Sequence, residues 1–261
     1  MRQETLRDLW NYRELFYFLA WRDVKVRYKQ TALGVAWAVL QPLLTMIIFT
    51  LLFGNLAKMP SEGMPYPLFY FGALLPWTYF STTLSNSGNS LVANAHLISK
   101  VYFPRIILPS SAAICGLVDF GIGCILLVGV MGHYRVNPGW GFLMWPILVV
   151  PLVGLTLAVS MILAALNVRF RDVKYTLPFL VQLWLFATPV IYPTSIVPER
   201  YRLLVALNPM SGLIDAFRAS LVPSKEIDWD MLWVSIGVTI VVFVIAAMYF
   251  RRTEHTFADI V

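Results

Sequence analysis

Residues 22–41, RDVKVRYKQTALGVAWAVLQ, pass from a basic, charge-rich segment into an apolar one. From residue 33 to residue 56 the chain contains no ionisable side chain. About 20 apolar residues are needed to cross the ~30 Å hydrocarbon core of a bilayer, so this junction predicts the start of a membrane-spanning helix. Because Lys and Arg concentrate in cytoplasmic segments, the cations before this helix are expected on the inner side of the membrane.

The composition supports a membrane protein. Of 261 residues, 59% are hydrophobic and 13% are charged, about half the charged fraction of an ordinary soluble domain. The net charge is +6, but the cations occupy short segments between apolar spans rather than one patch, which argues against nucleic-acid binding. Cys115 and Cys124 lie nine residues apart in one apolar stretch, about 13 Å along a helix, which is too far for a disulfide bond.

The hydropathy pattern predicts an all-α integral membrane protein with six spans. They cover approximately residues 33–56, 68–92, 106–132, 141–166, 176–192 and 231–250. On this topology both termini are cytoplasmic, and the inner segments hold 14 of the 20 Lys and Arg residues. That bias has the sign that the positive-inside rule requires.

Two segments outside the spans have a character of their own. Residues 1–30 mix cations with aromatic side chains, which predicts an amphipathic helix on the cytoplasmic face, with residues 31–261 forming the transmembrane domain. This charged start also gives no indication of a cleavable signal peptide. Residues 192–230 contain two apolar stretches, separated by Asn208-Pro209 and too short to cross a bilayer. We expect a re-entrant helical hairpin on the outer side; a long surface loop is the alternative.

Several sequence blocks occur in a fixed order along the chain. They are RYKQ at 27–30, LG at 33–34 with Trp37, LQP at 40–42, GALLPW at 72–77, LISKVYFP at 97–104, NVRFRD at 167–172, TPVIYP at 188–193, LNP at 207–209 and DAFR at 215–218. Each block alone is weakly specific. In this order and spacing, over some 200 residues, the chain resembles the transmembrane subunit of ABC-2 type exporters of O-antigen, teichoic acid and capsular polysaccharide.

The resemblance implies a homodimer of six-helix subunits in the inner membrane, with one ATPase subunit docked under each. It also implies export of a polysaccharide attached to a lipid diphosphate carrier. The chain has no G-x-x-x-x-G-K-[ST] phosphate-binding loop, so ATP and Mg²⁺ would be bound by the partner. It offers no catalytic triad or metal-ligand cluster, and we expect no enzymatic activity. An ABC-2 permease for drugs or small lipids is the alternative function.

The loop at 94–105 is the predicted site of ATPase coupling. It combines cations with apolar bulk, and aromatic anchors of this kind supply much of the contact energy at protein interfaces. Contact with lipid headgroups alone is the other interpretation; the resemblance favours docking. The assigned residues are Leu97, Lys100, Tyr102, Phe103 and Arg105.

Four cations just before the first span form the predicted entrance for the carrier diphosphate: Arg22, Lys25, Arg27 and Lys29. Arg suits this role better than Lys because its planar guanidinium binds phosphate through two hydrogen bonds. The alternative is that these cations only set topology and attract anionic lipids.

A sugar path should combine aromatic faces with small polar groups, each binding weakly enough to allow release. Helical spacing places such residues on common faces of the first, second and fifth spans. Packing or interface anchoring is the other explanation. The candidates are Trp37, Gln41 and Thr45; Trp77, Asn86 and Asn89; and Tyr175, Phe179, Gln182 and Phe186.

The hairpin supplies the predicted outer gate: Asn208, Pro209, Asp215 and Arg218. Asp215 and Arg218 stand at i, i+3 and could pair, at a few tenths of a kcal/mol, to order the hairpin.

Asp119 is a carboxylate near the middle of the third predicted span, where charge is costly. We expect it to be structural, either protonated or paired with a cation or a helix end.

Overall fold

The computed structural model describes residues 10–29, 34–137, 140–222 and 225–257. Over these ranges the chain consists of helices and their connections, with no strand. The α-helices are α2 (Arg13–Lys29), α3 (Gly34–Phe49), α4 (Tyr66–Ala93), α5 (Ala95–Lys100), α6 (Ile107–His133), α7 (Trp145–Arg169), α8 (Val173–Ala187), α9 (Glu199–Ala206), α10 (Pro209–Ala219) and α11 (Trp229–Thr253). Helix α3 continues as a π-helical segment, Thr50–Leu56, and short 3₁₀ turns cover Trp140–Met144, Thr194–Ile196 and Glu254–Thr256.

Four described helices are long and apolar enough to cross a membrane: Ala36–Leu56, Ile107–His133, Trp140–Arg169 and Trp229–Thr256. The all-α membrane class predicted from the sequence is therefore confirmed. Helix α4 has 28 residues but many small polar side chains, and α8 has 15 residues, which is about 22 Å of helix. The count of six spans stays a prediction.

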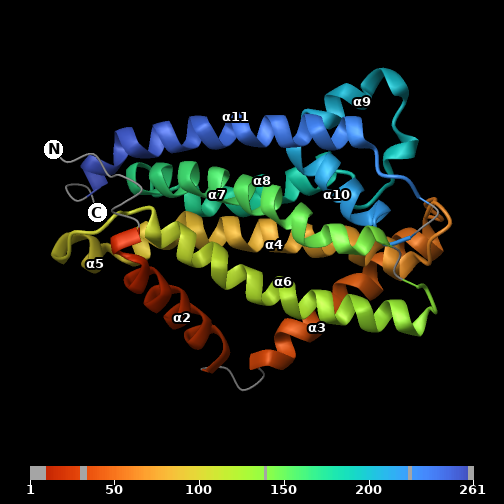
Figure 1. Ribbon diagram of the computed structural model, residues 1–261, viewed down its shortest axis with the longest axis horizontal. Helices are drawn as coiled ribbons and strands as arrows, with labels where there is room; N and C mark the ends of the chain where they lie inside the picture. Colours follow the sequence, from red (N-terminus) through yellow and green to blue (C-terminus); the bar gives the residue numbers. More distant parts are fainter. Residues whose placement is uncertain (1–9, 30–33, 138–139, 223–224, 258–261) are drawn as a thin grey trace.

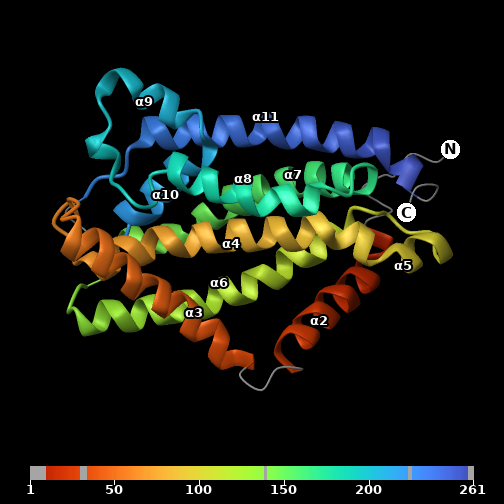
Figure 2. The ribbon, with the colours of Figure 1, turned by 180° about the vertical axis from the view of Figure 1, so that it is seen from behind.

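The long helices run side by side, with α4 in the middle (Figures 1 and 2). Helix α4 packs against α6 and α7, and α11 packs along α7. Helices α2 and α3 are inclined in opposite directions and form a V beside α4 and α6 (Figure 1). Helix α5, the start of α2 and the end of α11 lie at one end of the bundle, here called the α5 end; α9 lies at the opposite, α9 end.

Two clusters of buried side chains hold the bundle together. The larger joins α4, α6, α7 and α10 through residues such as Phe80, Phe120 and Phe217. The smaller lies at the α5 end, where Leu19 of α2 and Phe250 of α11 meet the loop after α5. Helix α2 is therefore fastened to the bundle at its first half by apolar contacts. The predicted interfacial segment 1–30 is described only from residue 10 to residue 29.

The segment predicted as a hairpin contains two short helices, α9 and α10, separated by Leu207 and Asn208. Every residue of α10 is buried. Asn208 caps α10, because its side-chain Oδ1 accepts a hydrogen bond from the Met210 amide at 3.2 Å, and Pro209 occupies the first turn, where a missing N–H costs nothing. The helical character of this segment agrees with the prediction; its depth in a membrane stays a prediction.

Candidate functional site

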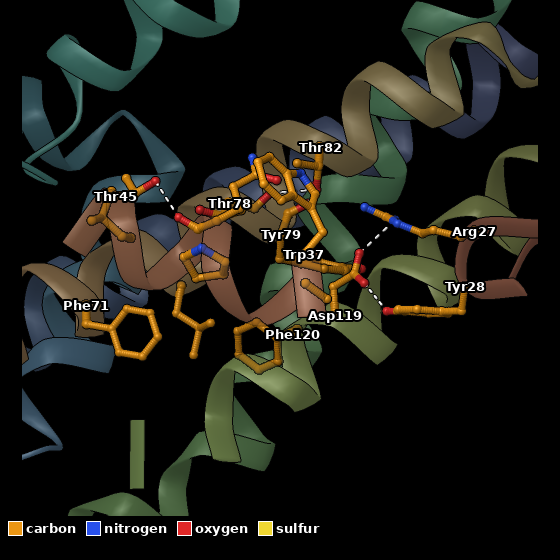
Figure 3. Close-up of a pocket in the computed structure, with 15 residues that line it drawn as sticks. Arg27, Tyr28, Trp37, Thr45, Phe71, Thr78, Tyr79, Thr82, Asp119 and Phe120 are labelled. Atoms are coloured by element: carbon orange, nitrogen blue, oxygen red, sulfur yellow. Dashed lines mark hydrogen bonds and ion pairs between the residues drawn. The ribbon is translucent and has the colours of Figure 1, made fainter. Parts of the chain in front are cut away.

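A cavity of about 340 Å³ lies between α2, α3, α4 and α6. We call it the aromatic cavity. Three successive turns of α3 line this cavity. Trp37, Gln41 and Thr45 are spaced at i, i+4 and i+8, so they share one face of α3 and all contribute to the cavity wall. The sequence assigned these three residues to one face, and the structure brings them together. The remaining labelled wall residues are Arg27, Tyr28, Phe71, Thr78, Tyr79, Thr82, Asp119 and Phe120 (Figure 3).

The polar groups of this wall differ in which hydrogen-bond donors and acceptors remain available to a ligand. The Thr45 hydroxyl donates to the Gln41 carbonyl at 2.8 Å, and the Thr82 hydroxyl donates to the Thr78 carbonyl at 2.7 Å. These threonines thus keep only lone pairs for a ligand. Trp37 and the amide of Gln41 are exposed. The cavity therefore offers an aromatic face beside amide and hydroxyl groups.

A second cavity, of about 650 Å³, lies between α2, α4 and α6. We call it the amide cavity, because asparagine side chains from the end of α4 line it. Asn86 and Asn89, both predicted for the sugar path, belong to this wall. Arg27 lines both cavities. The amide cavity is lined further by Arg22, Asp23, Val26, Ser90, Ala93, Asn94, Ala112 and Cys115.

The wall that the two cavities share carries an ion pair. Arg27 Nη1 lies 2.7 Å from Asp119 Oδ2, and the Tyr28 hydroxyl donates a hydrogen bond to Asp119 Oδ1. Asp119 is thus paired with a cation, which was one of the structural roles expected for it. Burial, followed by the hydrogen bond to Asp119, raises the pKa of Tyr28, so Tyr28 remains a hydrogen-bond donor at neutral pH.

The other predicted entrance cations are separated from this pair. Arg22 lines the amide cavity and pairs with the neighbouring Asp23 at 2.8 Å. Lys25 lies over the ring of Trp21 at 5.4 Å, and Lys29 is exposed. The structure therefore brings Arg22 and Arg27 to one cavity, while Lys25 and Lys29 line neither cavity.

The fifth-span face does not reach the aromatic cavity. Tyr175, Phe179, Gln182 and Phe186 form an exposed stripe on α8. Trp77 differs from all other predicted path residues because it is only 5% exposed, and its ring packs on Phe80 at 5.7 Å. Trp77 is a core residue within this chain.

The loop after α5 presents one aromatic side chain and buries the next. Tyr102 is 69% exposed, whereas Phe103 is 2% exposed and belongs to the cluster at the α5 end. The Tyr12 hydroxyl donates to the Tyr102 carbonyl at 3.2 Å, which holds the loop against the start of α2. Lys100 is exposed, and Leu97 and Arg105 are half-buried. Phe103 thus fixes the loop, and Tyr102 with Lys100 is free to contact a partner.

Arg218, assigned to the outer gate, is fully buried beneath the segment that follows α8. Its Nη2 donates to the carbonyls of Pro189 at 2.7 Å and Val190 at 3.1 Å, and its Nη1 donates to the Tyr192 carbonyl at 3.5 Å. The guanidinium also lies over the Phe69 ring at 3.9 Å. Burial lowers the pKa of Arg218 to about 10, so the side chain stays charged at neutral pH.

The pairing of Asp215 with Arg218 that their spacing allowed is not formed. Asp215 Oδ1 instead lies 3.2 Å from Lys225 Nζ and accepts a hydrogen bond from Thr194 at 2.8 Å. The expectation failed because Arg218 is drawn to backbone carbonyls on another segment, whose lone pairs would otherwise be buried without a donor. Lys225 also reaches Glu62 at 2.5 Å and so ties three segments together.

The sequence profile of the ABC-2 type transporter family matches residues 14–222. The chain belongs to this family. It is 34% identical to the O-antigen export system permease protein RfbA of Myxococcus xanthus, over 97% of this chain and 98% of that protein. A protein of the same name from Klebsiella pneumoniae is 28% identical over 92% of each chain, and the polysialic acid transport protein KpsM of Escherichia coli is 23% identical over 89% of this chain and 91% of that protein.

This ABC-2 chain contains contacts that sequence analysis did not single out. Asn167 is buried, and its Nδ2 donates to the Gly88 carbonyl and to Asn89 Oδ1, each at 3.0 Å. It therefore fixes α7 to α4 next to the amide cavity. Asn167 opens the NVRFRD block, so its place in a family motif was the available signal, and Tyr28 likewise lies in RYKQ. The hydrogen-bond partner of a single polar residue in a helix cannot be predicted from the sequence, because it depends on how the helices pack.

Proposed function

We propose that this ABC-2 chain is the membrane permease of an exporter for polysaccharide attached to a lipid diphosphate, of the O-antigen kind. The observation that carries the proposal is similarity over nearly the whole chain to permeases named for O-antigen export. A relative named for polysialic acid transport also matches over most of its length. Shared length matters here because a transport path is built from all the spans.

The working unit would be a homodimer in the inner membrane, with two copies of a separate ATPase subunit on the cytoplasmic side. Six helices of each subunit would span the membrane, with α9 and α10 re-entering from the outside. The α5 end supports this topology, because the start of α2, the end of α11 and the loop after α5 gather there (Figure 1). The segments at this end also carry cations, as expected of a cytoplasmic face: Lys100 of α5, Arg105 of the loop after it, and Arg251 and Arg252 of α11.

The sugar path would use the aromatic cavity, the amide cavity and the exposed stripe of α8. A pyranose ring has apolar C–H faces that stack on aromatic rings, and hydroxyls that exchange hydrogen bonds with Gln, Asn and Thr. Gln182 supports this role for α8, because its exposed amide lies among apolar residues and would be poorly placed against lipid. Two chains facing each other across these stripes would enclose polar groups from both.

The entrance for the carrier diphosphate would be the amide cavity, with Arg22 and Arg27 as the phosphate-binding groups. Lys25 and Lys29 would act through general attraction to anionic headgroups, worth about 1 kcal/mol each near a charged surface. The end of α5 and the loop after it would dock the ATPase through Lys100 and Tyr102. The outer gate would be held in shape by Asn208, Pro209, Asp215 and Arg218.

The test is ATP hydrolysis by the permease–ATPase complex in proteoliposomes, measured with and without lipid-linked glycan. We expect stimulation by the glycan and transfer of the glycan to the far side. Stimulation by small apolar compounds with none by the glycan would replace the proposal with the alternative, a permease for drugs or small lipids. Absence of stimulation by either compound class would contradict both.

A further inference from the structure

The pair formed by Arg27 and Asp119 occupies an unusual position. The guanidinium belongs to the walls of both cavities, and the carboxylate faces it from the middle of α6 (Figure 3). Cys115, one helical turn before Asp119, lines the amide cavity, whereas Asp119 lines the aromatic one. The ion pair thus stands at the boundary between an amide-rich space and an aromatic space.

The side chains of the pair are partly exposed, although the oxygen of Asp119 that faces Arg27, Oδ2, is itself buried. The side chain of Arg27 is 37% exposed and that of Asp119 is 24% exposed. Asp119 Oδ2 receives no hydrogen bond of regular geometry within the described part of the chain, although the guanidinium lies 2.7 Å away. The contact is therefore mainly electrostatic, and the two-pronged donor face of Arg27 is not used up by Asp119.

Asp119 has a second partner that would remain if Arg27 were drawn away. Tyr28 donates to Asp119 Oδ1 from the residue next to Arg27 on α2. A carboxylate without partners at this depth would be costly. With Tyr28 in place, the carboxylate keeps one hydrogen bond while its cation is engaged elsewhere.

We propose that Asp119 is a positioning residue that holds Arg27 between the two cavities and sets how tightly Arg27 binds a diphosphate group. This inference rests on the proposed function, because the diphosphate is that of the lipid carrier. A diphosphate carries more negative charge than one carboxylate and matches the guanidinium fork with two oxygens, so it displaces Asp119. When the diphosphate leaves, Asp119 recaptures Arg27.

Such competition suits a transport path. A site that binds its substrate too tightly cannot release it, and conduction requires contacts that are favourable but weak. Asp119 lowers the affinity of Arg27 by offering a competing anion within reach. Tyr28 moderates that competition, because its hydrogen bond withdraws part of the carboxylate charge from Arg27.

The experiment measures binding of inorganic pyrophosphate to the full chain in nanodiscs of zwitterionic lipid, without the ATPase, by isothermal titration calorimetry. We expect Asp119→Asn to tighten binding about 5- to 10-fold, because the competing charge is removed. Arg27→Gln should abolish binding, and Asp119→Glu should restore an affinity close to that of the native chain. Tyr28→Phe should weaken binding 2- to 3-fold, in the opposite direction to Asp119→Asn. At about 1.4 kcal/mol per tenfold, the change expected for Asp119→Asn corresponds to about 1 kcal/mol, as for a partly exposed ion pair, and that for Tyr28→Phe to about half as much.

The matched control is Asp172→Asn, which makes the same change in net charge at an exposed carboxylate before α8. Equal tightening in Asp172→Asn would reduce the effect to general electrostatics and overturn the proposal. Unchanged or weaker binding in a folded Asp119→Asn chain would also overturn it. If Asp119→Asn does not fold, the Tyr28→Phe result decides, since unchanged or tighter binding contradicts the assigned competition.

A second arm separates the sources of the phosphate chemistry. Nanodiscs containing an isoprenyl diphosphate should reduce pyrophosphate binding, whereas phosphatidylglycerol at equal charge should not. Equal competition by phosphatidylglycerol, or none by the isoprenyl diphosphate, would overturn the assignment to a carrier headgroup. The proposed export function fails by a different observation, the absence of glycan-stimulated ATP hydrolysis, so the two failures are distinguishable.

Discussion

At the scale of single residues, Arg218 shows how a buried cation can organise irregular backbone. The segment after α8 exposes carbonyls that no helix satisfies, and Arg218 donates to three of them. Asn208 completes the arrangement, because its Nδ2 donates to Thr188 Oγ1 at 2.8 Å and its Oδ1 accepts from the Trp184 indole at 3.0 Å. These residues hold the end of α8 against α10.

Arg218→Lys should therefore destabilise the protein although it keeps the charge. A lysine ammonium is a compact point charge and cannot reach carbonyls spread across a planar fork, so at least one buried carbonyl loses its donor. We expect a loss of about 1–3 kcal/mol, seen as a lower midpoint of thermal unfolding. Arg200→Lys, on an exposed site of α9, is the control and should leave the midpoint unchanged. Equal midpoints for both variants would contradict the role of Arg218.

The LISKVYFP block covers the end of α5 and the loop after it, and it places an exposed aromatic residue, Tyr102, beside a buried one, Phe103. Tyr102→Ala should reduce co-purification of the ATPase subunit at least several-fold, because an exposed aromatic anchor is lost, while thermal stability stays the same. Phe103→Ala should lower stability by about 3–5 kcal/mol, because it empties a buried site. A pull-down and an unfolding curve on each variant check both outcomes. Undiminished co-purification with Tyr102→Ala would place docking elsewhere.

At the scale of elements, the close contact of α10 with α11 depends on a glycine. The Gly212 amide donates to Ser235 Oγ at 3.1 Å, and a Cβ at position 212 would lie 2.5 Å from the Met231 carbonyl oxygen. The Met231 carbonyl belongs to the backbone of α11, so it cannot move aside as the end of a flexible side chain could. The entire burial of α10 therefore requires the absence of a side chain at this position.

Gly212→Ala should force α10 and α11 apart and cost about 1–3 kcal/mol. The control is Gly237→Ala on α11, where a Cβ would meet no atom within 4 Å; it should leave stability unchanged or raise it by up to ~1 kcal/mol, since Ala is the better helix former. Thermal unfolding of both purified variants gives the comparison. A Gly212→Ala chain as stable as the native one would show that the two helices separate without cost.

At the scale of the whole molecule, the proposed sugar path predicts that the exposed stripe of α8 and the exposed face of α3 contact water, whereas a lipid-facing surface would not. In a chain lacking Cys115 and Cys124, Gln41→Cys and Gln182→Cys should react with a charged, membrane-impermeant thiol reagent in the assembled complex. Ile240→Cys, on an exposed apolar stretch of α11, should not react, because charged reagents do not enter the hydrocarbon layer. The readout is mass spectrometry of the labelled chain. Labelling of residue 240 alone would reverse the assignment of the two surfaces.

Much of the architecture could be predicted because its signals are local. The apolar run after residue 33 predicts a helix of spanning length, and the structure has one from Ala36 to Leu56. The spacing of Trp37, Gln41 and Thr45 predicts a common face, since side chains four residues apart align on a helix. Both results follow from helix geometry within one segment of chain.

Other features required the folded chain. The sequence pattern assigned Trp77 to the sugar path and Phe103 to ATPase docking, but packing buries both side chains. The spacing of Asp215 and Arg218 allowed a local pair, but each found a partner 10 or more residues away in sequence. Which neighbour a polar side chain meets is decided by how helices approach one another, and no local pattern encodes that approach.

The sequence by itself determined that the chain is a helical membrane protein and which family it belongs to. The length of an apolar run, the charges at its ends and the order of the motifs are properties of the linear chain. Only the tertiary structure decided that Arg27 meets Asp119 between two cavities and that Arg218 holds the segment after α8. Arg27 and Asp119 are 92 positions apart in the sequence, and Arg218 lies up to 29 positions from the carbonyls to which it donates. They exist because packing removes water from particular helix faces, so that the fully buried Arg218 and the partly exposed Arg27 and Asp119 each meet a partner there.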